Sequence, residues 1–222
     1  MDVFVDDHQV DTGISGDHTV EDAVRYVQAS VCAPGRIVVS LRCDGQSVPA
    51  NGMAPALAKH SSTVDRLDVI TGTRQALVVD AMNQAAAALE NTEDQCRQVA
   101  ELLVEGSTAE GIKILGQCLG VWQQVYSAVT QSLQMLELEP EELTVADEPL
   151  VDLICRPKDV LLQVKEALES QDHVLLADIM QYEFDSVIHQ WRDVVGLLHD
   201  QAVALEERGT DCLAERDSAP PV

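Results

Sequence analysis

Hydrophobic residues change their spacing along this chain near residue 72. Before that point, short runs rich in β-branched residues alternate with turn residues, as in strands. After it, apolar residues recur every three to four positions, as in amphipathic helices. The pattern predicts an α+β protein with a small N-terminal domain over residues 1–72 and an antiparallel helical bundle over residues 73–208. Residues 209–222 are expected to form a disordered tail.

The N-terminal part begins with the signals of two strands and a helix. Residues 3–5 and 10–14 predict strands that are separated by a polar turn. Thr-Val-Glu-Asp at residues 19–22 predicts a helix start, because Thr19 can accept a hydrogen bond from an early backbone N–H. This helix is expected to end at Pro34-Gly35.

The rest of this part predicts a hairpin and a final strand. Apolar and polar residues alternate over residues 37–43, and Asp44-Gly45 is a strong hairpin signal that leads into a short strand near residues 47–48. One helical turn is expected at residues 56–59, and residues 67–70 predict the last strand.

The resulting order is strand, strand, helix, strand, strand, short turn, strand. It resembles the β-grasp fold of ubiquitin-like domains, on the first strand, the helix opening at residues 19–22, the hairpin at residues 36–48 and the strand at residues 67–70. The resemblance covers about a third of the chain. It implies a docking module that uses an exposed sheet face or hairpin edge.

The chain departs from two chemically active groups of that fold. Ubiquitin-like modifiers and sulfur carriers end in an exposed Gly-Gly, whereas Thr-Gly-Thr at residues 71–73 runs directly into a predicted helix. Plant-type ferredoxins hold an iron–sulfur cluster with four cysteines, whereas this part contains only Cys32 and Cys43. Conjugation and iron–sulfur chemistry are therefore not expected.

The first two helices of the bundle are marked by capping signals. Residues 74–91 predict a helix, and the capping box at residues 92–95 predicts that a new helix begins there, with one continuous helix to residue 105 as the alternative. Gly106 is the expected stop. A second capping box at residues 107–110 predicts a long helix to about residue 137.

The later helices are predicted from proline and aspartate positions. Residues 145–149 are expected to be a linker, and Pro157 to start or kink a helix that runs to residue 170. Asp172 is expected to cap a last long helix that ends at Gly209. The predicted buried face of this helix consists of Leu175, Ile179, Tyr182, Val187, Trp191, Val194, Leu198, Ala202 and Leu205.

Trp122 and Trp191 lie on predicted apolar stripes, so both are expected in the core; an exposed tryptophan would instead indicate a partner contact. Three glycines of the long second helix are expected to let a neighbouring helix approach closely: Gly111, Gly116 and Gly120.

The chain carries a formal net charge of −24. Residues 1–72 hold 10 acidic and 5 basic side chains, whereas residues 73–222 hold 28 and 9, so the acidity belongs mainly to the helical part. Such a charge repels phosphate backbones and anionic membranes, so we expect neither nucleic-acid nor membrane partners. The acids form either a solvated surface or a surface for a basic partner.

The cysteines and the N-terminus indicate the compartment. The six cysteines show no Cys-x-x-Cys spacing: Cys32, Cys43, Cys96, Cys118, Cys155 and Cys212. The first residues do not form a secretory signal, and no apolar run approaches the ~20 residues of a membrane span. Free thiols in the cytoplasm are therefore expected.

Candidate metal sites are weak. Asp185 and His189 are one helical turn apart, with Glu183 nearby and Asp178 a further turn back, but the Glu-x-x-His motif of di-iron bundles does not occur. We expect a solvated ion pair there and no metal. A polar cluster on two loops is explained more simply by turn chemistry: Asp6, Asp7, His8, Asp17 and His18. No cofactor site and no catalytic residues are predicted.

These observations favour a non-catalytic acidic cytoplasmic adaptor protein that binds other proteins, either basic partners or partners that present an amphipathic helix. The alternative is a secretion or flagellar-type assembly chaperone that binds an amphipathic client helix. Residues 74–207 are broadly similar to acidic bacterial chaperones of this kind in size, charge and helix pattern. An enzyme would need a deep pocket lined by titratable groups. The long apolar stripes are also compatible with a homodimer.

Overall fold

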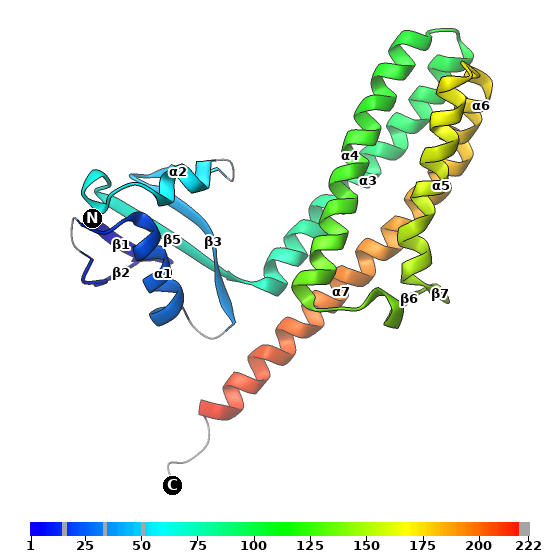
Figure 1. Ribbon diagram of the computed structural model, residues 1–222. Helices are drawn as coiled ribbons and strands as arrows, with labels where there is room; N and C mark the ends of the chain where they lie inside the picture. Colours follow the sequence, from blue (N-terminus) through cyan, green and yellow to red (C-terminus); the bar gives the residue numbers. More distant parts are fainter. Residues whose placement is uncertain (15–16, 33–34, 50–51, 218–222) are drawn as a thin grey trace. The chain divides into compact units, whose positions relative to one another are not determined.

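A computed structural model of the chain is shown in Figure 1. It describes residues 1–14, 17–32, 35–49 and 52–217, and beyond residue 208 only the backbone. The chain divides into two compact units, Met1–Arg74 and Gln75–Val222. The predicted α+β class is confirmed, because a mixed sheet in the first unit is followed by helices in the second.

The first unit is built on a five-stranded sheet with the order β2-β1-β5-β3-β4. The strands are β1 (Asp2–Val5), β2 (His8–Val10), β3 (Arg36–Cys43), β4 (Gln46–Ser47) and β5 (Arg66–Thr73). Strand β1 pairs with β5 in parallel, and the other pairs are antiparallel. The strands predicted near residues 3–5, 37–43 and 67–70 are confirmed, and β5 is longer than predicted, but the strand predicted at residues 10–14 is wrong because β2 ends at Val10.

Helix α1 (Val20–Ser30) begins where its sequence predicts. The Thr19 side chain accepts a hydrogen bond from the Asp22 backbone N–H, while the Asp22 carboxylate accepts one from the Thr19 N–H at 2.9 Å. Helix α1 buries Val20, Ala23 and Val27 in the same core as the sheet. The predicted stop at Pro34 lies outside the described residues. The short helix α2 (Met53–Leu57) overlaps the predicted turn at residues 56–59.

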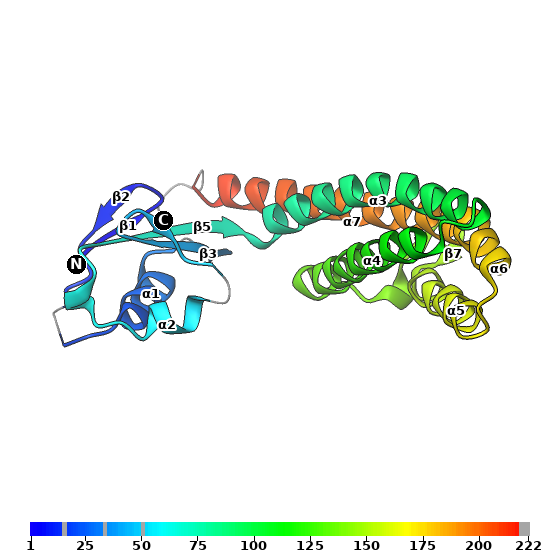
Figure 2. The same ribbon diagram turned by 90° about the horizontal axis from the view of Figure 1, so that it is seen from above.

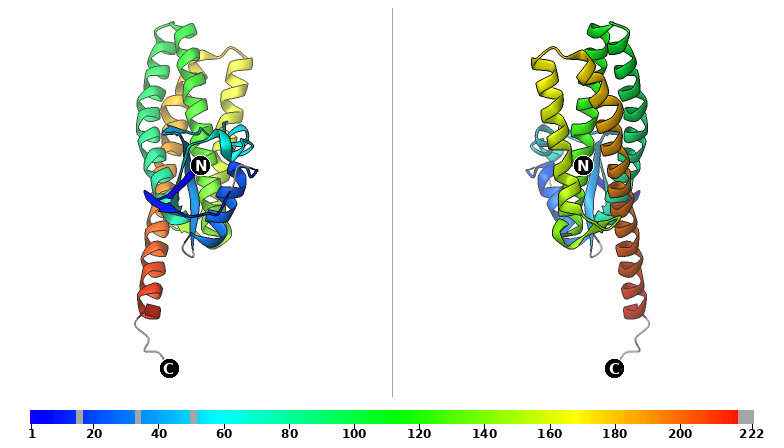
Figure 3. Two further views of the ribbon diagram at one scale, coloured as in Figure 1. Left: turned by 90° about the vertical axis from the view of Figure 1, so that its left-hand side faces the viewer. Right: turned by 90° about the vertical axis from the view of Figure 1, so that its right-hand side faces the viewer.

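The bundle consists of two helical hairpins, which Figure 3 shows packed against each other. The first hairpin is formed by α3 (Arg74–Val104) and α4 (Thr108–Leu136), and the second by α5 (Leu150–Glu169) with α6 (His173–Asp178) and α7 (Phe184–Asp217). One continuous apolar core joins the two. Figure 2 presents the same helices from above.

Helix α3 is continuous, so of the two alternatives that the sequence left open, a break at residues 92–95 or one helix, the structure shows one helix. The Thr92 hydroxyl donates to the Ala88 carbonyl inside the helix at 2.8 Å instead of capping a new one. Helix α3 is followed by Gly106 with φ 87°, the predicted stop. Helix α4 starts as predicted, but the Ser107 side chain makes no capping hydrogen bond.

The predicted linker at residues 145–149 is wrong, because these residues belong to a small hairpin. A 3₁₀ turn (Pro140–Glu142) leads into β6 (Thr144–Val145) and β7 (Glu148–Pro149), which are antiparallel. Ala146 and Asp147 have positive φ values of 50° and 68°, which fit a tight two-residue turn. The chain then enters α5 at Leu150, well before Pro157.

Pro157 therefore lies inside α5 rather than at its start. A proline has no N–H, so it cannot donate to the carbonyl four residues earlier, that of Leu153. The indole N–H of Trp191 on α7 donates to this carbonyl at 3.1 Å. A long-range contact thus satisfies the group that Pro157 leaves without a helical partner.

The last helical run is interrupted by a π-helical segment (Ile179–Glu183) between α6 and α7. Asp172 caps α6 as predicted, accepting from the Leu175 N–H at 2.9 Å. Because a π-helical turn adds a residue, the buried face before it shifts relative to the predicted stripe. Leu175 and Tyr182, predicted to be buried, are 44% and 63% exposed, and Leu176 and Met180 are buried instead.

Two glycine predictions are also corrected. Gly116 and Gly120 have nothing within 4 Å of where a Cβ would stand, so they do not admit a neighbouring helix, whereas at Gly111 a Cβ would stand 3.3 Å from the Leu103 side chain of α3, as predicted. Helix α7 continues to Asp217, so the predicted end at Gly209 is wrong and the first part of the predicted tail is helical. A glycine weakens a helix by roughly 1 kcal/mol relative to alanine but does not by itself end it.

Candidate functional site

An aromatic cluster joins α4 and α7 in the middle of the bundle. Trp122 contacts Trp191 and Phe184, with ring centroids 4.8 Å and 5.4 Å apart. Both tryptophans are buried, which confirms the predicted core positions. Tyr126 stacks on Trp191 at 5.7 Å and is 40% exposed, so one side of the cluster reaches the surface of α4.

A groove lies near the C-terminal end of α4, beside the start of α5. It has a volume of about 500 Å³. We call it the acidic groove and define it by its lining: Thr130, Leu133, Gln134, Glu137, Leu138, Glu139, Pro140 and Ile154. Leu133, Leu138, Pro140 and Ile154 make its surface partly apolar. Tyr126 is one helical turn before Thr130, on the same side of α4.

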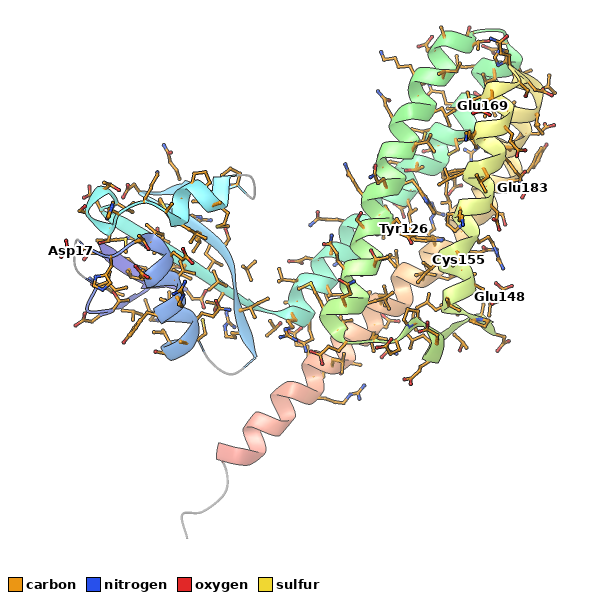
Figure 4. All side chains as sticks on the ribbon, in the orientation of Figure 1. Asp17, Tyr126, Glu148, Cys155, Glu169 and Glu183 are labelled. Carbon is orange, nitrogen blue, oxygen red and sulfur yellow. The ribbon has the colours of Figure 1, made fainter. Side chains whose placement is uncertain are left out.

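The surroundings of the groove are strongly acidic. Seven acidic residues lie between positions 137 and 152, where the sequence has no lysine or arginine. All seven are exposed: Glu137, Glu139, Glu141, Glu142, Asp147, Glu148 and Asp152. Arg156 pairs with Glu148 at 2.9 Å. Figure 4 shows Tyr126 on α4, Cys155 on α5 and Glu148 on the β6–β7 hairpin in this part of the bundle.

The acidic groove was not predicted from the sequence. The sequence shows the acids of residues 137–152, but they read as a helix end followed by a linker. Because the segment folds into a 3₁₀ turn and a hairpin, it returns the chain to α4 and brings Ile154 beside Leu133 and Leu138. The density of acids without a basic residue was the available signal.

Asp185 and His189 form a contact as predicted, with 3.5 Å between Asp185 Oδ2 and His189 Nε2. The structure adds Glu93 of α3, and the ligand atoms of these three residues lie within 4.8 Å of one another. Glu93 Oε2 pairs with Arg192 at 2.6 Å. Sequence reasoning missed Glu93 because it is distant in the chain. Glu183 and Asp178, named from the sequence, are not in this cluster.

Asp6 and Asp7 lie in the turn between β1 and β2 with positive φ, as their sequence indicates, but the Asp6 side chain also bonds to the distant strand β5. Asp6 Oδ1 accepts from the Thr71 N–H at 2.8 Å, and Asp6 Oδ2 accepts from the Thr71 hydroxyl at 2.6 Å. The hydrogen bonds from Thr71 are the main cause that lowers the pKa of Asp6, and Arg36 adds to them. His8 Nδ1 lies 2.8 Å from the Asp6 carbonyl oxygen.

Two buried thiols meet in the bundle. Cys96 of α3 is hydrogen-bonded with Cys118 of α4, and this contact together with burial raises the pKa of Cys96. A thiol with a raised pKa is a poor nucleophile at neutral pH. Cys155 is exposed, and no disulfide joins the cysteines whose side chains the structure describes. Among the residues that the structure describes, no helix is long and apolar enough to cross a membrane.

Comparisons with known proteins give two family matches. The model of a domain of unknown function, DUF8042, matches residues 80–194. The model of the TP0873 N-terminal domain matches residues 1–73. The first match includes the aromatic cluster, the acidic groove and the Glu93–Asp185–His189 cluster, and the second ends where β5 ends. No curated protein and no solved structure matches the chain.

Proposed function

The chain belongs to the DUF8042 family, and from the geometry of its bundle we propose that it is a non-catalytic acidic cytoplasmic adaptor protein. Its bundle binds a basic amphipathic segment of a partner protein in the acidic groove. The observation that carries this proposal is the combination of a partly apolar groove with seven exposed acids and no basic residue between positions 137 and 152.

The chemistry of the groove defines its occupant. The half-buried Leu138, Pro140 and Ile154 offer contacts for apolar side chains, and the acids of the same segment attract lysine or arginine. An amphipathic helix carries both kinds of residue on adjacent faces, so it suits such a surface. Charge complementarity also speeds encounter, and its contribution falls as salt rises.

The first unit supports the adaptor proposal, because it would serve as a second docking module. Its sheet order and the parallel pairing of β1 with β5 support the proposed β-grasp type. Strand β5 continues directly into α3, so Gly72 is not at a free C-terminus. The absence of a disulfide among the described thiols supports the cytoplasmic part of the proposal.

The proposal is tested with a defined probe. A synthetic helical peptide of Leu and Lys, labelled with a fluorophore, is titrated with the full chain at ~50 mM and ~300 mM salt, and anisotropy is measured. We expect saturable binding that weakens at the higher salt. A peptide in which Glu replaces every Lys should not bind.

Two charge-reversal variants locate the binding surface. One carries Glu139→Lys, Glu141→Lys and Glu142→Lys beside the groove. The control carries Glu166→Lys, Glu169→Lys and Glu183→Lys, which change the net charge equally at exposed positions elsewhere. We expect the groove variant to weaken binding at least about tenfold and the control to change it far less. Equal effects would mean that only the overall charge binds the peptide, which contradicts the proposal.

The second candidate function is the secretion or flagellar-type assembly chaperone, which the groove also favours because a client helix would occupy it. The two functions differ in what happens to the partner. A chaperone keeps its client from aggregating in proportion to the amount added, whereas an adaptor binds a partner that is stable alone. The partner to test is one that the wild type captures and the groove variant does not. Its aggregation alone and with added wild-type protein is followed by light scattering. A chaperone should suppress that aggregation, whereas the partner of an adaptor should not aggregate alone.

A further inference from the structure

The cluster of Glu93, Asp185 and His189 joins the two hairpins of the bundle at one point. Asp185 and His189 are one turn apart on α7, and Glu93 belongs to α3. Together they offer one imidazole nitrogen and two carboxylates within 4.8 Å of one another. We propose that these three side chains form a binding site for a divalent transition-metal ion of the zinc class.

The distance between Asp185 and His189 supports a shared metal ion. Two ligand atoms that are each about 2.0–2.1 Å from zinc lie about 3.3 Å apart at the tetrahedral angle. Asp185 Oδ2 and His189 Nε2 are 3.5 Å apart, which is close to this spacing and long for a direct hydrogen bond. The carboxylate of Glu93 lies within 4.8 Å of both atoms and has to approach them to complete three ligands.

The ligand types select the metal. Imidazole and carboxylate together suit zinc and similar transition metals, whereas calcium and magnesium prefer oxygen ligands only. The His189 and Asp185 side chains are 57% and 39% exposed, so an ion can enter from solvent. Three protein ligands leave the fourth position to water.

The neighbouring charges set the geometry of Glu93. Arg192 holds Glu93 Oε2 at 2.6 Å, while Arg97 is 3.4 Å from Oε1 and 3.3 Å from Asp94. Arg192 therefore orients the carboxylate from the side of one oxygen, as outer partners do for metal ligands. Oε1, whose contact is the longer, is the oxygen that binds the ion.

A bound ion would fasten α3 to α7. Binding to the folded state alone stabilises a protein in proportion to the logarithm of the free ligand concentration over its dissociation constant. Zinc should therefore raise the midpoint of thermal unfolding, and a chelator should reverse the rise. This inference is independent of the acidic groove, which lies elsewhere on the bundle.

The experiment is a titration of the untagged, metal-free full chain with zinc chloride by isothermal calorimetry. We expect one site per chain. His189→Gln and Asp185→Asn should each raise the dissociation constant at least about tenfold, a loss typical even of outer partners of metal sites. The matched control is His199→Gln, because His199 lies 3.1 Å from Asp200 on the same helix and no third ligand joins this pair among the side chains that the structure describes.

The structural role of these residues is separated from metal binding by a second readout. The thermal midpoint of each variant is measured with chelator and with zinc, and the zinc-induced rise should disappear in His189→Gln and persist in His199→Gln. The proposal is overturned if the wild type shows no saturable binding below about 100 μM zinc, a weak affinity by protein–ligand standards. Binding that survives both His189→Gln and Asp185→Asn also overturns it.

Discussion

The two units of this protein use their acidic residues in opposite ways. In the first unit, Asp6 and Asp44 accept hydrogen bonds from backbone N–H groups of β5, and Asp22 accepts one from the Thr19 N–H that precedes its own helix. In the bundle, the seven acids between positions 137 and 152 are exposed around a partly apolar groove. The comparison teaches that equal charges have different roles: the first set holds turns and strands together, whereas the second is exposed on the segment beside the groove that we propose binds a partner.

The hydrophobic cores of the two units also differ, in size and in composition. The sheet and α1 enclose a small core, made largely of valine and leucine, and its edges are held by polar turns. The bundle has a larger core that includes both tryptophans of the chain. Tryptophan fluorescence therefore reports on the bundle, and hydrogen exchange of the β5 amides reports on the first unit. These two probes allow each prediction to be assigned to one unit.

The largest expected effect concerns Trp191 and Pro157. Trp191→Phe removes the N–H that satisfies the Leu153 carbonyl, and a buried carbonyl without a partner costs about 1–3 kcal/mol. In a Pro157→Ala background the new backbone N–H of residue 157 can donate to Leu153, so Trp191→Phe should cost less. We expect a coupling of about 1–2 kcal/mol between the two positions.

This coupling is measured by denaturant unfolding followed through the fluorescence of Trp122, which all four chains of the cycle retain. The exchange of β5 amides should stay unchanged throughout. Additive effects of the two substitutions would show that the indole N–H does not compensate for Pro157. A simultaneous loss of protection in β5 would mean that the two units unfold together, which would contradict the comparison.

The second effect lies in the first unit, at Gly72 of β5. A Cβ at this position would stand 2.9 Å from Val39 Cγ2, too close for an unstrained contact. Replacing a strand glycine by alanine gains roughly 0.5–1 kcal/mol, and an off-rotamer valine costs about 0.5–1.5 kcal/mol. Gly72→Ala should therefore be nearly neutral in the wild type and stabilising by about 0.5–1 kcal/mol in a Val39→Ala background.

Exchange of the β3 and β5 amides in the four chains of this cycle measures the effect, with tryptophan fluorescence as the control for the bundle. If Gly72→Ala has the same effect with and without Val39→Ala, the close approach of Val39 is not what limits the position. A change in the bundle midpoint would again show that the units are coupled.

The sequence allowed local features to be predicted, because they depend on neighbouring residues. The cap at Thr19 and Asp22 and the stop at Gly106 follow from residue type and spacing alone. Contacts between distant residues were not predictable in this way. Nothing near Pro157 indicates that Trp191 satisfies Leu153, and nothing near Asp185 indicates that Glu93 joins it.

Errors in register had a related cause. The predicted stripe through Leu175 and Tyr182 assumed regular helical periodicity, which the π-helical segment interrupts. The acidic groove was missed because its lining combines α4 and the helix end at residues 137–140 with Ile154 of α5, which is distant from them in the chain. The aromatic core was predicted because Trp122 and Trp191 keep the spacing of their own helices.

The smallest expected effect tests whether the acids of the first unit are structural. The hydrogen bonds from Thr71, with a contribution from Arg36, lower the pKa of Asp6 in the folded state below its usual value of 3.8. A lowered pKa means that the ionised carboxylate stabilises the fold fully above the unfolded value. This stability is lost as the pH falls through the lower folded value. Asp6→Asn should therefore destabilise the first unit at neutral pH, by less than about 1 kcal/mol because the side chain is partly exposed and screened.

The difference between wild type and Asp6→Asn should stay constant at neutral pH and shrink below about pH 3.8, the unfolded reference. Asp7→Asn is the matched control, because Asp7 is the exposed neighbour in the same turn and also has positive φ. Exchange of the Thr71 amide, which donates directly to Asp6, reports the loss most closely. If the stabilities of wild type and Asp6→Asn remain parallel through the acid range, the Asp6 carboxylate does not hold β5. The contrast between structural acids in the first unit and exposed acids in the bundle would then be contradicted at Asp6.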